Sequence, residues 1–183
     1  FTKFCGLLRI YELQRDSLLL ALEDFMRSLD ELPELVEPDQ VVFEYTTFVD
    51  EANWKLLLET SMEGYHIKSL HQESFYPFGY DNLNVVETFG PHSRVVYPFQ
   101  RIEQVRGIAP DKLNLTGLVT SVYMLFPNAS ISVLSKHSNL VILEPISPSQ
   151  SQWVIYSLIN AAPDNAPITA EDARRDAAFV NDS

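Results

Sequence analysis

The sequence predicts an α+β fold in which an antiparallel β-sheet is flanked by helices, and two observations carry this prediction. Residues 83–159 contain six short segments rich in β-branched and aromatic residues, separated by turns that contain Gly, Pro, Asn or Ser. Such short turns join antiparallel strands, whereas parallel strands need long crossovers. Helical signals lie outside this region, in residues 17–29, in residues 50–65 and from Thr169 onward.

The segments before residue 83 are predicted to be a helix, a strand and a second helix. Residues 17–29 place their apolar side chains on one helical stripe behind a serine that can cap it. Residues 40–49 are β-branched and aromatic and partly alternate, which suits a half-exposed strand. Residues 50–65 again show helical spacing, and the acidic pair Asp50 and Glu51 suits a helix N-terminus.

The later segments complete the sheet and add one helix. The aromatic stretch 75–80 is predicted to be a loop, and the polar stretch 100–115 a helix or loop that covers the sheet. Thr169 can cap a last helix whose first turn holds Glu171 and Asp172. The predicted strands are LNVVETF, SRVVYPF, GLVTSVYMLFP, ASISVLS, NLVILEPI and SQWVIYSLI.

Length, charge and cysteine content narrow the class of protein. The chain has 183 residues, 46% of them hydrophobic, which suits a single domain with one core. Its formal net charge of -12 opposes binding to nucleic-acid phosphates, and no apolar run approaches the roughly 20 residues that cross a bilayer. The single cysteine, Cys5, can form neither an internal disulfide nor a cysteine-rich metal site. We therefore expect a cytoplasmic protein that binds neither nucleic acid nor membrane.

The residues with the clearest chemistry are Glu63, His66 and His71, one carboxylate and two imidazoles within nine residues. Ferrous iron and similar metals take these two kinds of ligand together. On an ideal helix His66 and His71 point about 140° apart, from the 3.6-residue turn. We therefore expect the helix to end or loosen near residues 67–70 if both rings are to share one ion. The alternative is a pair of half-buried, hydrogen-bonded rings with no metal.

The run NWKLLLETSMEGYHIKSLH, residues 53–71, resembles the iron-binding signature in the α subunits of Rieske non-haem iron ring-hydroxylating oxygenases. The match is ungapped over its whole length, and it is specific because it joins NWK, the acids and the spaced histidines. The resemblance implies the C-terminal catalytic domain of such a subunit, with a helix-grip fold. It also implies a mono- or dioxygenase that uses Fe(II) and dioxygen to hydroxylate an aromatic or other small organic substrate.

The same resemblance assigns roles to individual residues. It implies that His66 and His71 are two of the three protein ligands of a mononuclear Fe(II), and that the third ligand is an acid far downstream. Glu171, Asp172 and Asp176 are late acids, but helix-terminal acids are also expected simply to complement the helix dipole. We therefore expect the third carboxylate to lie beyond Ser183.

Glu63 matches the carboxylate that, in this family, bridges an iron histidine and a Rieske-cluster histidine of the neighbouring subunit. The resemblance implies that it is the electron-transfer bridge, although many relatives carry Asp at this position. The alternative is a solvated acidic helix face. Aromatic side chains could line an apolar pocket over the iron, although an ordinary core explains most of them; these are Phe75, Tyr76, Phe78, Tyr80, Tyr123, Met124 and Phe126. His92 and His137 are not predicted to be ligands.

A two-iron two-sulfur Rieske cluster needs two Cys and two His, so it cannot lie in this chain. We expect both ends to be truncated and residues 1–39 to be the connection from a missing N-terminal Rieske domain. This fragment alone is then expected to be inactive. The full-length subunit would form a homotrimer and take electrons from a reductase or ferredoxin.

Two other functions remain open from the sequence. One is a non-catalytic helix-grip domain that binds a hydrophobic ligand and whose histidines are incidental. The other is a metal-dependent hydrolase that uses the same two histidines and an acid with zinc. The sequence does not indicate which substrate is bound.

Overall fold

The structure, a computed structural model, describes residues 41–115, 117–160 and 167–181. The helix predicted over residues 17–29, the connection predicted over residues 1–39 and Cys5 lie outside the described residues. Within the described part, no helix has the length and apolar character needed to cross a membrane.

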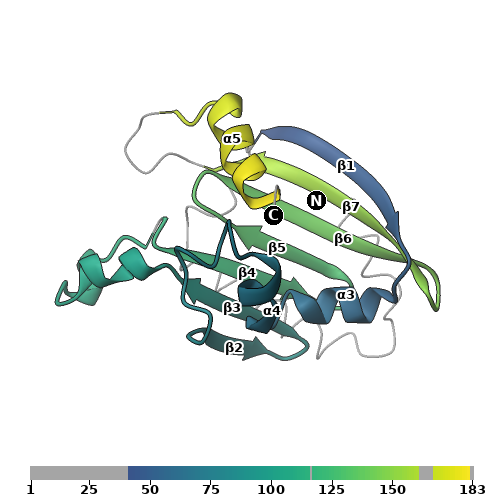
Figure 1. Cartoon of the computed structure of the whole chain (residues 1–183), viewed down its shortest axis with the longest axis horizontal. Coiled ribbons are helices and arrows are strands. Elements are labelled where there is room, and N and C mark those ends of the chain that lie inside the picture. Colours follow the sequence, from purple (N-terminus) through teal and green to yellow (C-terminus); the bar gives the residue numbers. More distant parts are fainter. Residues whose placement is uncertain (1–40, 116, 161–166, 182–183) are drawn as a thin grey trace.

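Seven strands form one antiparallel sheet in the order β1-β7-β6-β5-β4-β3-β2 (Figure 1). The predicted strands are all present, with ends that differ by a few residues, which confirms the predicted α+β fold with an antiparallel sheet. The strands are β1 (Val42–Asp50), β2 (Val85–Phe89), β3 (His92–Pro98), β4 (Val119–Leu125), β5 (Ala129–Val133), β6 (His137–Ser147) and β7 (Gln150–Ile159).

The sheet is a meander with one long-range addition. Strands β2 to β6 each pair with the next strand along the chain. β1 instead pairs with β7, from Val42 opposite Leu158 to Asp50 opposite Ser151. The first strand therefore forms one edge of the sheet and β2 forms the other.

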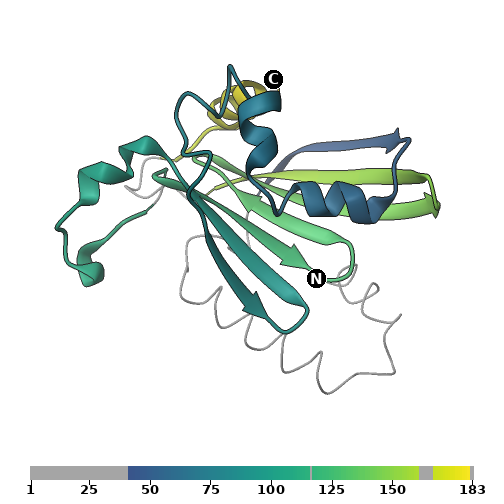
Figure 2. The ribbon, with the colours of Figure 1, turned by 60° about the horizontal axis from the view of Figure 1, so that its bottom comes forward.

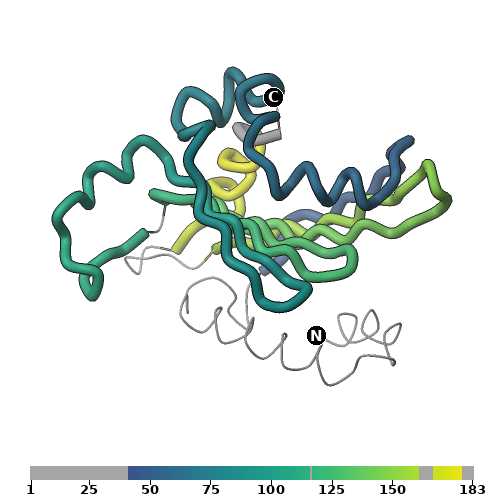
Figure 3. Tube along the Cα trace, turned by 90° about the horizontal axis from the view of Figure 1, so that it is seen from below, coloured from purple at the N-terminus to yellow at the C-terminus, as the bar shows by residue number. Residues whose placement is uncertain are grey.

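The three α-helices of the described residues lie on the same face of the sheet, as Figures 2 and 3 show. They are α3 (Trp54–Thr60), α4 (Tyr65–Leu70) and α5 (Ala170–Asn181). Strand side chains alternate between faces, and Val95 of β3 with its partner Val122 points to the helix face, where Ile67 of α4 packs against them. The adjacent Tyr123 belongs to the separate buried cluster of the opposite face. The helix-face core thus holds α4 in place.

The helix predicted over residues 50–65 is correct only in its middle, because α3 covers Trp54–Thr60 and a separate helix, α4, begins at Tyr65. Asp50 ends β1 instead of starting a helix, and Asn53 is the N-cap of α3. Its Oδ1 accepts a hydrogen bond from the Lys55 N–H at 3.0 Å, while its Nδ2 donates to the Pro148 carbonyl at 2.8 Å. Asn53 therefore begins the helix and ties it to the β6–β7 turn.

Residues 100–115, which we call the arm, do not cover the sheet as predicted. They form the 3-10 helices η2 (Gln100–Val105) and η3 (Pro110–Lys112) and project beyond the sheet (Figure 2). Gly107, at φ 83°, and Pro110 prevent one continuous α-helix. Most of the arm's residues are exposed, so it contributes little to the core.

Candidate metal centre

The candidate site is built around the break between α3 and α4, where Glu63 holds the start of α4. One carboxylate oxygen, Oε2, accepts hydrogen bonds from the backbone N–H groups of Tyr65 at 2.5 Å and His66 at 3.3 Å. These N–H groups lie in the first turn, where a helix has no partners of its own for them. Glu63 therefore acts as a cap for α4, a role that the sequence analysis missed.

The other oxygen of the same carboxylate orients the ring of His66. Glu63 Oε1 lies 2.6 Å from His66 Nδ1. Because an ionised carboxylate only accepts hydrogen bonds, Nδ1 carries the proton and donates it to Oε1. In a neutral ring with this tautomer, the Nε2 atom carries the lone pair, which is the form that binds a metal.

His71 comes next to His66 because α4 ends immediately before it. The residue is the C-cap of α4, with φ -109° and ψ 39°, and its N–H still donates to the Ile67 carbonyl at 3.0 Å. The two imidazole centroids lie 5.4 Å apart with their planes at 69°. This confirms the expectation that the helix must end near residues 67–70 for the two rings to meet.

Burial and charge set the protonation of the site. Burial alone would raise the pKa of Glu63, but hydrogen bonds from the His66 ring and the Tyr65 backbone outweigh it and hold that pKa below its usual value. Burial, together with the nearby His66, lowers the pKa of His71. An ionised carboxylate beside a neutral imidazole is a suitable ligand environment for a divalent cation.

Tyr97 of β3 contacts the chain at the break between α3 and α4. The sequence contained no signal for this role. Its hydroxyl donates to the Ser61 carbonyl at 3.5 Å, at the C-terminal end of α3. Burial, with a smaller contribution from the Glu63 charge, raises the pKa of Tyr97 to about 12. The hydroxyl therefore stays protonated and remains a hydrogen-bond donor.

The three late acids each have a partner other than the two histidines. Glu171 pairs with Arg175 on the exposed side of α5, at 2.9 Å. Asp172 Oδ2 accepts from the Thr169 hydroxyl at 2.7 Å, closing the N-terminus of the helix. Asp176 Oδ2 lies 2.8 Å from Nδ1 of the buried His137. None of the three is paired with His66 or His71 in the described part of the chain.

His92 and His137 have hydrogen-bond partners that do not belong to the candidate site. His92 is buried at the start of β3, and its Nδ1 accepts a hydrogen bond from the Phe126 N–H at 3.2 Å. His137 is buried under α5 and bonded to Asp176. Within residues 41–115, 117–160 and 167–181, no group of three or more His, Cys, Asp or Glu side chains is placed to hold an ion.

A cavity of about 420 Å³ is lined by side chains that include Ser74, three positions after His71 in the sequence. Of the predicted pocket residues, Phe75 and Phe78 line it, whereas Tyr123 and Met124 belong to the core and Phe126 is exposed. The lining was not predictable in full because it comes from four separate segments: Ser74, Phe75, Pro77, Phe78, Phe99, Gln100, Arg101, Leu134, Ser135 and Asp176.

Comparison with known proteins points to one family. The family model described as "Ring hydroxylating alpha subunit (catalytic domain)" matches residues 38–182. No curated protein matches the chain.

Among solved structures, the fold is similar to naphthalene 1,2-dioxygenase from Rhodococcus sp. bound to indole. That match has a TM-score of 0.59 and 17% identity, and it covers 87% of this chain and 43% of the dioxygenase chain. A second similar structure is the quaternary ammonium Rieske monooxygenase CntA in complex with an inhibitor. Here the TM-score is 0.56 and the identity 14%, over 78% of this chain and 35% of CntA. At these identities the likeness concerns the fold, and the chain spans about a third of the length of CntA.

Proposed function

The chain belongs to the family of ring-hydroxylating α-subunit catalytic domains, and from this premise we propose that it is the mononuclear iron domain of a Rieske-type oxygenase. The proposed reaction is the Fe(II)- and dioxygen-dependent hydroxylation of an aromatic or other small organic substrate. The solved relatives named for naphthalene and for quaternary ammonium compounds support a small organic substrate. We also propose a cytoplasmic location.

The observation that carries the proposal is the pair of imidazoles with a carboxylate behind one of them. The His66 and His71 rings are 5.4 Å apart, and Glu63 is bonded to the Nδ1 side of His66. Metal-bound histidines commonly donate their second ring N–H to a carboxylate in this way. The alternative, two half-buried histidines with no metal, does not account for this orientation of the His66 ring by a carboxylate.

The donor set fits ferrous iron. Two neutral imidazoles and one carboxylate on a single face leave open positions for dioxygen. His66 and His71 would supply the imidazoles, and we propose that the third carboxylate lies beyond Ser183. Bound there, Fe(II) would supply the activation of dioxygen. The role of His66 is to hold its Nε2 toward the ion while Glu63 keeps the proton on Nδ1.

We propose a second role for Glu63, as the bridge through which electrons arrive. Its side chain is 38% exposed although it is bonded to His66, so it can reach a group outside this chain. That group would be a histidine of the two-iron two-sulfur Rieske cluster in a neighbouring subunit of a homotrimer. A reductase or ferredoxin would supply the electrons to that cluster. The chain alone would then bind iron without turning over.

Iron retention tests the proposal without requiring turnover. Anaerobic reconstitution with ferrous iron and removal of unbound metal should leave close to one iron per chain, measured by a colorimetric chelator assay. The His66→Ala, His71→Ala double variant should retain almost none. Gln72→Ala, an exposed neighbour of His71, is the control and should bind as the wild type does.

Thermal melting gives a second readout of the same site. A ligand that binds only the folded state raises the melting temperature, so Fe(II) should stabilise the wild type and the Gln72→Ala control but not the double variant. Equal iron content in the wild type and the double variant would exclude an iron site at these histidines. It would favour the non-catalytic ligand-binding alternative.

A further inference from the structure

The cavity of about 420 Å³ has an aromatic wall. Phe75 and Phe99 pack against each other with ring centroids 5.1 Å apart and planes tilted by 38°. Phe78 and Leu134 extend the apolar lining, so a planar ring can contact side chains from three separate segments. Aromatic pairs favour such offset or tilted packing, and a further ring can join it. The volume of about 420 Å³ is within the range of small-molecule sites.

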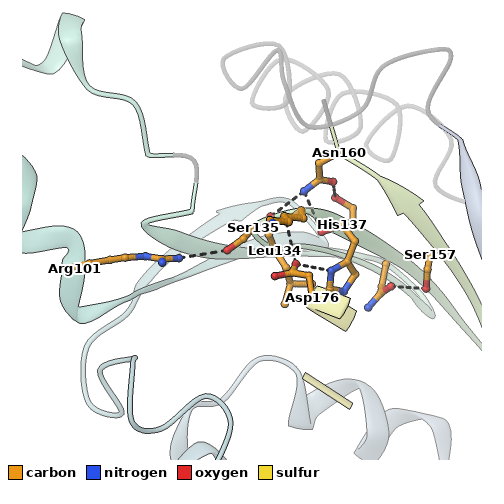
Figure 4. Close-up of polar contacts among 10 residues, drawn as sticks. Arg101, Leu134, Ser135, His137, Ser157, Asn160 and Asp176 are labelled. Carbon is orange, nitrogen blue, oxygen red and sulfur yellow. Dashed lines mark hydrogen bonds and ion pairs between the residues drawn. The ribbon is translucent and has the colours of Figure 1, made fainter. Parts of the chain in front are cut away.

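A cation lies over this aromatic wall. The Arg101 guanidinium carbon sits 4.9 Å from the Phe99 ring centroid, and Nη2 makes a long hydrogen bond of 3.4 Å to Ser135 Oγ. Figure 4 shows the side chain reaching from the arm toward the Leu134–Ser135 turn. The described residues provide no carboxylate partner for it, so most of its five N–H donors are available.

An anion lies at the α5 side of the same cavity. Asp176 Oδ2 is occupied by the Lys136 N–H at 3.0 Å and by His137 at 2.8 Å (Figure 4). Burial would raise the pKa of Asp176, but these hydrogen bonds outweigh burial and lower it, so the carboxyl stays ionised. A bound anion would be repelled from this end and directed toward Arg101.

We propose that Arg101 makes this cavity a binding site for a small aromatic carboxylate. The carboxylate would bind the guanidinium, with the Ser135 hydroxyl as a further donor, and the ring would lie against Phe75, Phe78 and Phe99. A guanidinium fork matches a carboxylate in two parallel hydrogen bonds. The proposal depends on the cavity and does not require iron at His66 and His71.

Benzoate is the probe, and benzamide is its uncharged control of nearly the same shape. Both are titrated into the chelator-treated, metal-free chain by isothermal calorimetry, so the result is independent of the iron site. The wild type should bind benzoate at least tenfold more tightly than benzamide, because hydrogen bonds to charged groups are the stronger ones. Equal binding of the two, or no benzoate binding, overturns the proposal.

Two arginine variants locate the effect. Arg101→Gln should weaken benzoate binding about tenfold or more and leave benzamide binding unchanged. Arg106→Gln is the matched control, since Arg106 is on the same arm but pairs with Glu103 and does not line the cavity. Equal benzoate affinities in the two variants would mean that the anion binds elsewhere. If Arg101→Gln failed to fold, the benzoate-to-benzamide ratio of the wild type would still decide the question.

Discussion

At the scale of single residues, Glu63 does more than its place in the motif suggests. One carboxylate oxygen caps the first turn of α4 and the other holds the His66 ring. The acid therefore contributes to folding as well as to the proposed iron site. Loss of this side chain should affect both.

We predict that Glu63→Ala lowers the free energy of unfolding by about 1 kcal/mol, the usual cost of losing a helix cap. It should also reduce iron retention, because His66 loses the group that fixes its ring. Urea denaturation and the iron assay measure the two effects. Glu59→Ala, which removes an exposed acid from α3, is the control. Unchanged stability in Glu63→Ala would contradict the capping role.

At the scale of elements, α3 and α4 are too short to be stable alone, and their positions depend on contacts outside each helix. Asn53 joins the start of α3 to Pro148, and Tyr97 joins its end to β3. Together these contacts locate the break that brings His66 and His71 together. The geometry of the site is thus set partly by the sheet.

We predict that Asn53→Ala costs about 1 to 2 kcal/mol of unfolding free energy, because it removes both a cap and a tertiary hydrogen bond. Lys55→Ala, in the same helix, keeps both contacts of the Asn53 side chain and should cost much less. Urea denaturation of the two variants provides the comparison. Similar losses in both would show that general helix propensity matters more than the Asn53 contacts.

At the scale of the whole molecule, the predicted architecture was correct because it rests on local patterns: the alternation of β-branched residues and the short turns. Helix geometry also predicted that a helix has to end near residues 67–70 if His66 and His71 are to meet, and α4 does end at Leu70. The break at residues 61–64 was not predictable, because it depends on contacts between segments far apart in the sequence: Asn53 with Pro148 in the β6–β7 turn, and Tyr97 of β3 with Ser61. The projection of the arm was missed for the same reason. The local sequence of a polar segment does not show whether the segment covers the sheet or extends away from it.

The contact between α5 and the sheet should make stability depend on pH. The pKa of Asp176 is lowered in the folded state from an ordinary value of 3.8. Its contribution is therefore present above about pH 4 and lost as the pH falls through the lowered folded-state pKa. Asp176→Asn should be less stable than the wild type near neutral pH, with the two converging in acid.

Urea denaturation between pH 3 and pH 7 measures this dependence. Glu171→Gln, an exposed acid on the same helix, is the control and should follow the wild-type curve closely. A constant difference between Asp176→Asn and the wild type across this range would show that the carboxylate charge is not responsible.

The pairing of β1 with β7 has a consequence for synthesis of the chain on the ribosome. Strands β2 to β7 can pair one hairpin at a time as they emerge, since each strand from β3 onward pairs with the strand before it. β1 is synthesised before the other six strands but can pair only after β7 has been synthesised, since Val42 of β1 lies opposite Leu158 of β7. Such distant contacts slow folding. During that delay the exposed Val42, Tyr45 and Phe48 make β1 a candidate for chaperone binding.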